Sequence, residues 1–246
     1  MKILVTNDDG ILSEGIKALA ESLGTLGEVW LVAPDRERNA ISHALTLHRP
    51  LRVLSSAPRH YVVNGTPSDC VNLGVHFILK EKPALIVSGI NKGSNLGDDS
   101  NYSGTVAAAV EGALMGIPSF AISLEARKDF KFMPAAGFAL RLARVILQRG
   151  LPQGTLLNVN VPNSEGRELM HYRITTLGKH RHHNTIVEKV DPRGLNYYWI
   201  GRKDEVSEED DSSDLNAIRQ KLISITPFQV DRTHYASLDE LRQWVL

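Results

Sequence analysis

Several features that would point to particular protein classes are scarce or missing in this sequence. It has one cysteine, Cys70, so no intrachain disulfide and no cysteine-based zinc cluster can form, which fits a reducing, cytoplasmic setting. The first apolar run ends after three residues, where an export signal needs about 7–15. No run approaches the roughly 18–20 apolar residues of a membrane span. We therefore expect neither an export signal nor a membrane-spanning segment.

An excess of charge of one sign is also missing. Lys plus Arg and Asp plus Glu both number 28, which gives a formal net charge of zero. Nucleic-acid grooves and membrane-surface patches need a strong basic excess, so we expect neither as a partner. A polar small molecule remains compatible. A chain of 246 residues can bury roughly 70% of its extended surface, so bulk stability needs no metal or disulfide.

Strand-like apolar runs and helical periodicity alternate along most of the chain. The strand-like runs cover residues 2–6, 29–33, 84–88, 119–123 and 155–159. Helical spacing of apolar residues covers 14–23, 68–79, 105–115 and 135–148. This alternation predicts an α/β fold with a doubly wound, mostly parallel sheet.

Two stretches break the alternation. Residues 47–53 and 61–64 predict a strand pair inserted between βα units. In the C-terminal part the pattern changes to short strands, including 197–200 and 222–225, followed by a last helix over 238–246. The molecule should therefore carry an inserted β-hairpin and a β-rich and helical C-terminal part.

No Pro-, Gly- or Ser-rich linker separates the C-terminal part from the rest. We therefore expect one α/β domain over residues 1–246, with a core over 1–165 and a protruding excursion over 166–246. Residues 204–214 hold seven carboxylates and no cation, which predicts a solvated, mobile loop.

The tetrapeptide Asn7-Asp8-Asp9-Gly10 follows the first predicted strand. Ligands of open α/β sheets bind at the carboxyl ends of the strands. Adjacent carboxylates repel each other unless a proton or a cation intervenes, and a hard divalent ion such as Mg²⁺, Mn²⁺ or Ca²⁺ prefers oxygen ligands. An Asx turn before a helix uses the same residue types, so the tetrapeptide alone leaves both interpretations open.

A glycine-rich stretch over residues 88–99 follows the third predicted strand of the sheet. Long loops between compact elements are commonly functional, and an ordinary turn is the alternative. Ser103-Gly104-Thr105 then opens a helix whose N–H groups suit a phosphate. Neither the P-loop motif nor the dinucleotide-binding motif is present, which argues against ATPases and dinucleotide enzymes.

A polar loop over residues 34–40 follows the second predicted strand. Asn39 offers a neutral carbonyl oxygen to a metal, while Arg36 and Arg38 either clamp a phosphate or pair with the loop's own carboxylates. The histidine-rich residues 179–183 are interpreted as exposed surface, because no carboxylate lies near them in the sequence.

Several of these segments together resemble the SurE family of survival proteins. They are Asn7-Asp8-Asp9-Gly10, Ala33-Pro34-Asp35-Arg36, Gly65-Thr66-Pro67-Ser68-Asp69-Cys70, Ser88-Gly89-Ile90-Asn91 and Tyr102-Ser103-Gly104-Thr105. The resemblance implies a Rossmann-like sheet and a metal-dependent phosphatase that hydrolyses nucleoside 5'-monophosphates, with 3'-nucleotides and short polyphosphate as further substrates. It also implies homodimers or homotetramers in which C-terminal segments reach onto neighbouring subunits.

Carried over residue by residue, the resemblance implies one Mg²⁺ or Mn²⁺ per subunit, bound by Asp8, Asp9, Asn39 and Asn91. Many members have serine where this chain has Asn39. An amide oxygen serves the same kind of cation, so we expect the site to persist, with its geometry or metal preference altered.

The implied mechanism uses Asp8 and Asp9 as the catalytic pair around a metal that activates water. The sequence leaves open which of them acts as a base. The remaining phosphate oxygens would be held by Asn95, Ser103, Gly104 and Thr105.

Two alternatives stay open. A phosphatase with an aspartyl-phosphate intermediate usually has Asp-x-Asp after the first strand, whereas Asp8 and Asp9 are adjacent. A non-enzymatic nucleotide or metal sensor would use the same loops without turnover. Tyr102 can stack on a purine only if folding brings it over the metal.

Overall fold

The centre of the molecule is a nine-stranded, mostly parallel sheet in the order β3-β4-β2-β1-β5-β6-β7-β11-β8. The computed structural model describes residues 1–164, 171–206 and 210–245, with the backbone alone for 180–185 and 201–206. The strands of the sheet are β1 (Lys2–Thr6), β2 (Glu28–Pro34), β3 (Val53–Ala57), β4 (His60–Val63), β5 (Leu85–Lys92), β6 (Ser119–Glu125), β7 (Thr155–Pro162), β8 (Tyr172–Ile174) and β11 (Ile223–Gln229).

Helices flank this sheet, and a separate two-stranded ribbon lies outside it. The helices are α1 (Glu14–Leu23), α2 (Pro67–Leu73), the π-helix η1 (Gly74–Leu79), the 3₁₀-helix η2 (Gly97–Asn101), α3 (Gly104–Leu114), α4 (Phe132–Arg149), α5 (Asp214–Arg219), the 3₁₀-helix η3 (Tyr235–Ser237) and α6 (Leu238–Leu241). The ribbon consists of β9 (His180–Val190) and β10 (Asn196–Val206).

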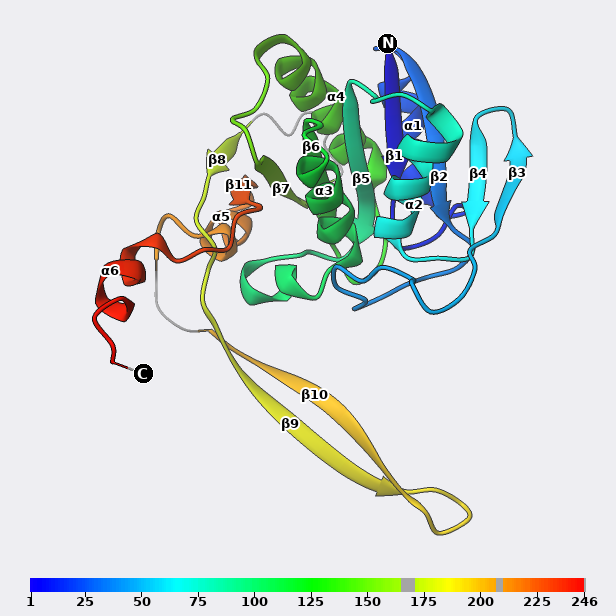
Figure 1. Cartoon of the computed structure of the whole chain (residues 1–246). Helices are drawn as coiled ribbons and strands as arrows, with labels where there is room; N and C mark the ends of the chain where they lie inside the picture. The colour runs from blue at the N-terminus through cyan, green and yellow to red at the C-terminus, as the bar shows by residue number, and fades with distance from the viewer. Residues whose placement is uncertain (165–170, 207–209, 246) are drawn as a thin grey trace.

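Six neighbouring strands, from β4 to β7 in the sheet order, run parallel. Their carboxyl ends form the lower edge of the sheet in Figure 1. Strand β11 runs antiparallel to β7, and β3 runs antiparallel to β4. Because β2, β1 and β5 are neighbours, the loops that follow these three strands meet at one place on this edge.

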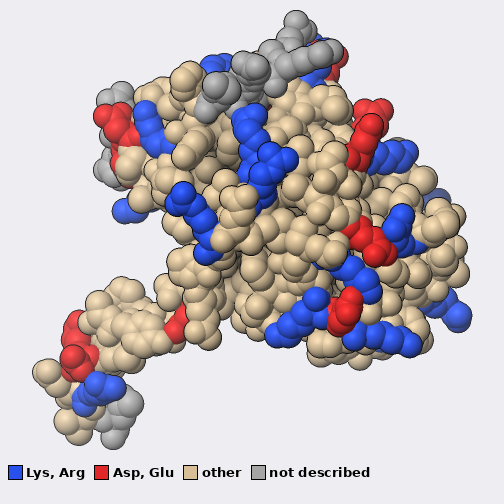
Figure 2. All heavy atoms as spheres, turned by 90° about the horizontal axis from the view of Figure 1, so that it is seen from above, with Lys and Arg blue, Asp and Glu red and all other residues tan. Residues whose placement is uncertain are grey.

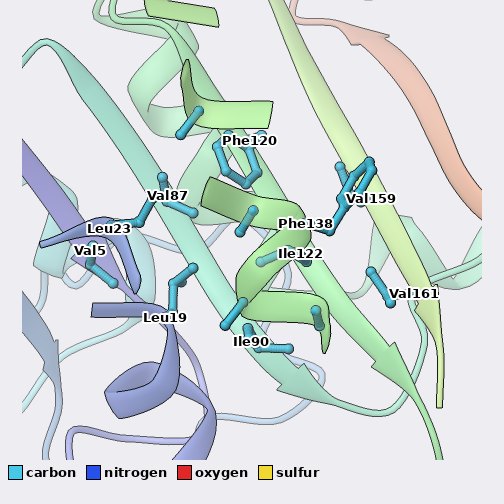
Figure 3. Close-up of a cluster of buried hydrophobic side chains, with 14 of the residues drawn as sticks. Val5, Leu19, Leu23, Val87, Ile90, Phe120, Ile122, Phe138, Val159 and Val161 are labelled. Carbon is cyan, nitrogen blue, oxygen red and sulfur yellow. The ribbon is translucent and has the colours of Figure 1, made fainter. Parts of the chain in front are cut away.

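Helices cover both faces of the sheet, as the alternation of buried side chains along β1 requires. Ile3 and Val5 pack with α1 and α4 on one face, whereas Leu4 packs with α2, η1 and α3 on the other. Figure 3 shows the first of these layers, including Leu19 of α1 and Phe138 of α4. The predicted doubly wound, Rossmann-like α/β fold is therefore confirmed.

The inserted hairpin is present but begins later than predicted. It pairs β3 with β4, and residues 47–52 hold no strand. Pro50 lies within this stretch and has no N–H to donate to a ladder, which explains why pairing starts only at Val53.

Strand β5 extends four residues beyond the predicted end at Ser88, through Lys92. The extension pairs with β6, and Gly89 makes it possible. A Cβ on Gly89 would lie 2.3 Å from the carbonyl oxygen of Ile122, and the φ of this residue is +141°. Only glycine fits there, and the strand thereby delivers Asn91 to the carboxyl edge.

The ribbon of β9 and β10 extends away from the body on the side of the carboxyl edge (Figure 1). Residues 204–206 belong to β10, so the first part of the acidic stretch is a strand and not the predicted loop. Residues 207–209 of this stretch lie outside the described residues. Residues 204–206 form a strand because they pair with β9, and this long-range pairing cannot be predicted from the local charge pattern.

Asp214 also departs from the predicted solvated loop, because it is fully buried at the start of α5. Its carboxylate accepts hydrogen bonds from the N–H groups of Gly97 and Gly178, each at 2.8 Å. The bond from Gly97 fastens the C-terminal part of the chain to the start of η2, whereas the bond from Gly178 lies within the C-terminal part.

The predicted C-terminal helix over 238–246 is shorter in the structure, where α6 ends at Leu241. Leu241 and Trp244 are exposed, so no apolar neighbour within the described residues holds the last turns. Short helices without packing are marginal in water, which explains the early end.

The described residues contain no helix that is both long and apolar enough to span a bilayer. Basic and acidic side chains are spread over the face shown in Figure 2, in line with the formal net charge of zero.

Candidate active site

A cavity of about 570 Å³ opens at the carboxyl edge, where the loops after β1, β2 and β5 meet. It is lined by Asp8, Asp9, Glu37, Asn39, Ala40, Asn91, Lys92, Ser94, Asn95, Asp99, Tyr102 and Ser103. The structure therefore brings the four expected metal ligands together with two of the four residues expected to hold phosphate.

Asp8 lies at the bottom of this site and is only 4% exposed. The Thr105 hydroxyl donates to Oδ1 of Asp8, and the Thr105 N–H donates to Oδ2 at 3.2 Å. Burial raises the pKa of Asp8 to about 6, against the opposing effect of the Thr105 hydrogen bonds, and the charge of Asp9 adds to the rise. A buried carboxylate of this kind gains from a nearby cation.

The loop that carries Asp8 is held by its own neighbours. The Asn7 amide donates to the Gly10 carbonyl and to the Ser13 hydroxyl, both at 2.9 Å. Ser13 in turn caps α1. The start of α3 packs closely against this loop, since a Cβ on Gly104 would lie 3.0 Å from the Cβ of Asp8.

Asp9 is half-buried beside Asp8, and its Oδ2 accepts a hydrogen bond from the Lys92 N–H at 3.1 Å. Burial raises the pKa of Asp9, and the nearby Glu37 adds to this effect. The backbone bond and the charge of Lys92 oppose it. Both adjacent carboxylates are therefore less stable as anions than ordinary aspartates, which favours occupancy by a cation.

Asn39 and Asn91 each use the amide nitrogen for a local hydrogen bond. The Asn39 nitrogen donates to Oε2 of Glu37 at 3.4 Å, and the Asn91 nitrogen donates to the Gly93 carbonyl at 2.9 Å. Both side-chain oxygens then remain available as acceptors in the cavity. Two carboxylates and two amide oxygens match the all-oxygen ligand preference of Mg²⁺ and Mn²⁺.

The residues expected to hold phosphate divide into two groups. Ser103 lines the cavity and caps α3, where its side chain accepts from the Val106 N–H at 3.1 Å. Gly104 and Thr105 do not line the cavity, and both polar groups of Thr105 are directed at Asp8. Thr105 therefore holds the carboxylate, a role that differs from the expected contact with substrate.

Asn95 lines the cavity but is anchored in a buried amide cluster. Its N–H donates to Oδ1 of Asn160 at 2.7 Å, and its side chain donates to the Ser123 hydroxyl at 2.8 Å. Its carbonyl accepts from the side chains of Asn158 and Asn160. Strands β6 and β7 thus fix Asn95 at the edge of the site, and the sequence gives no local signal for this cluster.

Three charged residues of the cavity, Glu37, Lys92 and Asp99, were given no role in the site by the sequence analysis. Tyr102 also lines the cavity and is 53% exposed, so folding does bring its ring to the site. The position of Lys92 directly after the expected metal ligand Asn91 was the sequence signal that could have placed it in the site.

Arg36 and Arg38 do not line the cavity. Arg38 donates to Oδ1 of Asp35 at 3.0 Å, and Arg36 lies 3.9 Å from the same oxygen. The structure therefore favours pairing within the loop over a phosphate clamp.

A histidine that the sequence left without a partner finds one through the fold. His43 Nε2 lies 2.6 Å from Oε2 of Glu111, whose Oε1 accepts from the Asn72 side chain at 2.8 Å. The His43 hydrogen bond lowers the pKa of Glu111, against the effect of burial. This contact joins the loop that carries Asn39 to helix α3.

No cluster of three or more His, Cys, Asp or Glu side chains suited to a metal occurs in the described part of the chain. The expected ligand set has two such residues, Asp8 and Asp9, and is completed by the amides of Asn39 and Asn91. Side chains at 180–185, which include the histidine-rich segment, lie outside the described residues.

Comparison with known proteins agrees with this geometry. The family described as "Survival protein SurE" matches residues 3–184. A protein from Geotalea uraniireducens named "5'-nucleotidase SurE" is 53% identical over 247 residues and covers 100% of both chains. A protein of the same name from Myxococcus xanthus is 50% identical over 245 residues, covering 99% of this chain and 93% of its own.

The fold has a close match as well. The crystal structure of the SurE protein from Aquifex aeolicus matches with a TM-score of 0.90 at 38% identity and covers 98% of each chain. By its motifs, its sequence relatives and its fold, the chain belongs to the SurE family.

Proposed function

We propose that this protein is a 5'-nucleotidase, a divalent-metal-dependent phosphatase that hydrolyses nucleoside 5'-monophosphates to nucleoside and phosphate. One Mg²⁺ or Mn²⁺ per subunit would be held by Asp8, Asp9, Asn39 and Asn91. The observation that carries the proposal is that two carboxylates with raised pKa values and two amide oxygens line one cavity. The names of the relatives support the substrate class.

The bound metal would supply positive charge for the phosphate oxygens and a water of lowered pKa. The chain's residues prepare the site for this chemistry. Thr105 holds both oxygens of Asp8, whereas the one hydrogen bond described for Asp9 comes from the Lys92 N–H. Asp9 is therefore the better placed of the two to take a proton. Ser103, which lines the cavity directly before α3, would orient the phosphate group.

The same cavity also fits two other proposals of lower rank. Formation of an aspartyl-phosphate would require a carboxylate free for attack, and Asp8 is held by Thr105. A nucleotide or metal sensor would bind through the same residues without turnover. Tyr102, at the cavity rim, is our candidate for stacking on the base, and 3'-nucleotides and polyphosphate are candidate further substrates.

The deciding experiment is phosphate release from a panel of nucleoside 5'- and 3'-monophosphates and polyphosphate with Mg²⁺, Mn²⁺ or EDTA. We expect turnover of 5'-monophosphates that needs metal and is lost in an Asp8→Asn/Asp9→Asn double variant. Asp129→Asn is the matched control, since Asp129 is an exposed carboxylate outside the cavity. Absence of turnover with either metal, with nucleotide binding intact, would favour the sensor.

We further propose a single α/β domain, with the core and C-terminal excursion expected from the sequence, that assembles into homodimers or homotetramers. The exposed apolar side chains of the β9–β10 ribbon support assembly through the excursion. A cytoplasmic location is proposed on the single, buried and unpaired thiol of Cys70.

A further inference from the structure

The charges of the candidate active site are unbalanced. Four carboxylates line the cavity, those of Asp8, Asp9, Glu37 and Asp99, against one basic side chain, that of Lys92. With all of them ionised, and counting only the residues that line the cavity, a single divalent cation leaves a net charge of minus one. A phosphate monoester dianion entering this site would meet net repulsion unless a positive group faces it directly.

Lys92 is firmly placed at the cavity. It is the last residue of β5, and its N–H donates to Asp9 Oδ2 at 3.1 Å. On the other side it pairs in register with Leu124 of β6, and the next residue, Gly93, donates to the Leu124 carbonyl at 3.0 Å. The backbone is thus held from both sides, while the side chain is exposed at the cavity.

The ammonium group of Lys92 is available to a ligand. Within the described residues, no carboxylate oxygen forms an ion pair with it at 4.0 Å or less. The two arginines closest in sequence to the site, Arg36 and Arg38, are turned toward Asp35 instead. Lys92 is therefore the basic side chain among the described residues that line this cavity.

We propose that Lys92 binds the phosphate group of the substrate through its ammonium group and offsets the negative charge contributed by Glu37 and Asp99. The inference rests on the proposed function for the identity of the substrate, but the anion-binding role is independent of turnover. A compact ammonium on a flexible stem gives charge-assisted hydrogen bonds to phosphate oxygens without demanding one fixed geometry.

A direct contact between Lys92 and phosphate can be distinguished by experiment from a purely structural role of this residue. Removing the charge of Lys92 weakens phosphate binding, because an attractive contact is lost. The same change leaves divalent-metal binding unchanged or tighter, because a cation that repels the metal is removed. A general distortion of the loop would weaken both.

The test compares Lys92→Gln, which removes the charge and keeps a polar side chain one atom shorter, with Lys92→Arg, which keeps the charge. Lys17→Gln on α1 is the matched control, since Lys17 is exposed and lies outside the cavity. Binding of inorganic phosphate to the Mn²⁺-saturated protein is measured by calorimetry, and Mn²⁺ binding by electron paramagnetic resonance.

We expect Lys92→Gln to raise the phosphate Kd about tenfold, with the Mn²⁺ Kd equal or lower. Lys92→Arg should stay within about threefold of the wild type, and Lys17→Gln should match it. Unchanged phosphate binding in Lys92→Gln, or parallel weakening of phosphate and Mn²⁺, would overturn the proposal.

The two proposals fail separately. If the wild type binds phosphate through Lys92 but hydrolyses no nucleotide, the proposed function is refuted and the anion-binding role of Lys92 is supported. If the wild type hydrolyses nucleotides and Lys92→Gln binds phosphate as tightly as the wild type, only the proposed role of Lys92 is refuted.

Discussion

Burial of Asp8 is the residue-scale feature around which the site is organised. A carboxylate at 4% exposure is stabilised by the two Thr105 hydrogen bonds, yet its pKa still rises to about 6. A folded-state pKa above the unfolded value means that ionisation of Asp8 disfavours folding once the pH exceeds about 4. This cost grows until the pH passes about 6 and then stays constant, and a bound cation would relieve it.

Asp8→Asn should therefore separate stability from activity. Asparagine can donate to the Thr105 hydroxyl and accept from the Thr105 N–H, so both contacts survive without the buried charge. In EDTA at pH 8 we expect the variant to match or exceed the wild type, by up to roughly 2–3 kcal/mol in unfolding free energy. Phosphate release should fall at least about a thousandfold.

Thermal unfolding with EDTA and with Mn²⁺ checks this prediction. Mn²⁺ should raise the Tm of the wild type and leave that of Asp8→Asn almost unchanged. A metal-free variant that is clearly less stable than the wild type would contradict our account of the buried charge.

Asn39 is the second residue whose contribution can be isolated. Its nitrogen is engaged by Glu37, which leaves its oxygen for the cavity. We expect Asn39→Ser, which restores an oxygen ligand, to keep phosphate release within about tenfold of the wild type. Asn39→Leu has similar size and no oxygen, and should raise the metal concentration needed for half-maximal activity at least about tenfold. Equal behaviour of the two variants would argue against Asn39 as a ligand.

At the scale of elements, the position of the loop after β2 depends on helix α3. The contact between His43 and Glu111 is at 2.6 Å, and Asn72 of α2 binds the other oxygen of Glu111. The lowered pKa of Glu111 means that the ionised carboxylate stabilises the fold at pH values above its ordinary pKa. That contribution is lost as the pH falls through the folded-state value.

Glu111→Gln should accordingly destabilise the protein most near neutral pH. We expect a loss of about 1–3 kcal/mol in unfolding free energy at pH 7, because the variant removes a charge-assisted hydrogen bond. The difference from the wild type should shrink at an acidic pH below the lowered pKa of Glu111, where the wild type takes up the proton. Urea unfolding at both pH values measures it, and an equal difference at the two would contradict the ionic contribution.

The close approach of β5 and β6 at Gly89 permits an equally direct test. Gly89→Ala places a methyl group against the Ile122 carbonyl at a positive φ, so we expect a loss of at least about 3 kcal/mol in unfolding free energy. Gly137→Ala is the control, since no heavy atom lies within 4 Å of the new Cβ in α4. It should stabilise the fold by about 0.5–1 kcal/mol. Chemical denaturation of both variants measures the two changes in unfolding free energy, and a Gly89→Ala variant as stable as Gly137→Ala would contradict the close approach of β5 and β6.

On the scale of the whole molecule, the ribbon of β9 and β10 is the part least explained by a single chain. Trp199 and Ile200 are 63% and 74% exposed on a segment that extends away from the body (Figure 1). Exposed apolar patches of this kind are typical of protein–protein contacts. This is the structural basis for the proposed assembly.

A Trp199→Ser/Ile200→Ser double variant should lower the oligomer mass measured by multi-angle light scattering, by a factor of two or more. Leu54→Ser is the control, because Leu54 is also exposed, at 67%, but lies on the β3 edge of the body. An unchanged mass in the double variant would show that the ribbon makes no essential contact between subunits.

The order and type of the core elements follow from local patterns in the sequence. Periodicity is local, so α1 has the predicted bounds, and α2 begins at Pro67, one residue before the predicted start. The polar residues after β1, β2 and β5 could be assigned to one sheet edge, because parallel strands place their carboxyl ends together. Asp8, Asp9, Asn39 and Asn91 do line one cavity there.

The contacts between residues that lie far apart in the sequence could not be predicted from it. The Thr105–Asp8 contact spans 97 residues, and the Asp214–Gly97 contact spans 117. No local sequence pattern predicts either contact, because strand order and helix packing bring the two residues of each pair together. The same holds for the extension of β5, which places Lys92 at the cavity through pairing with β6. Local propensity decides what an element is, whereas long-range packing decides what its side chains meet.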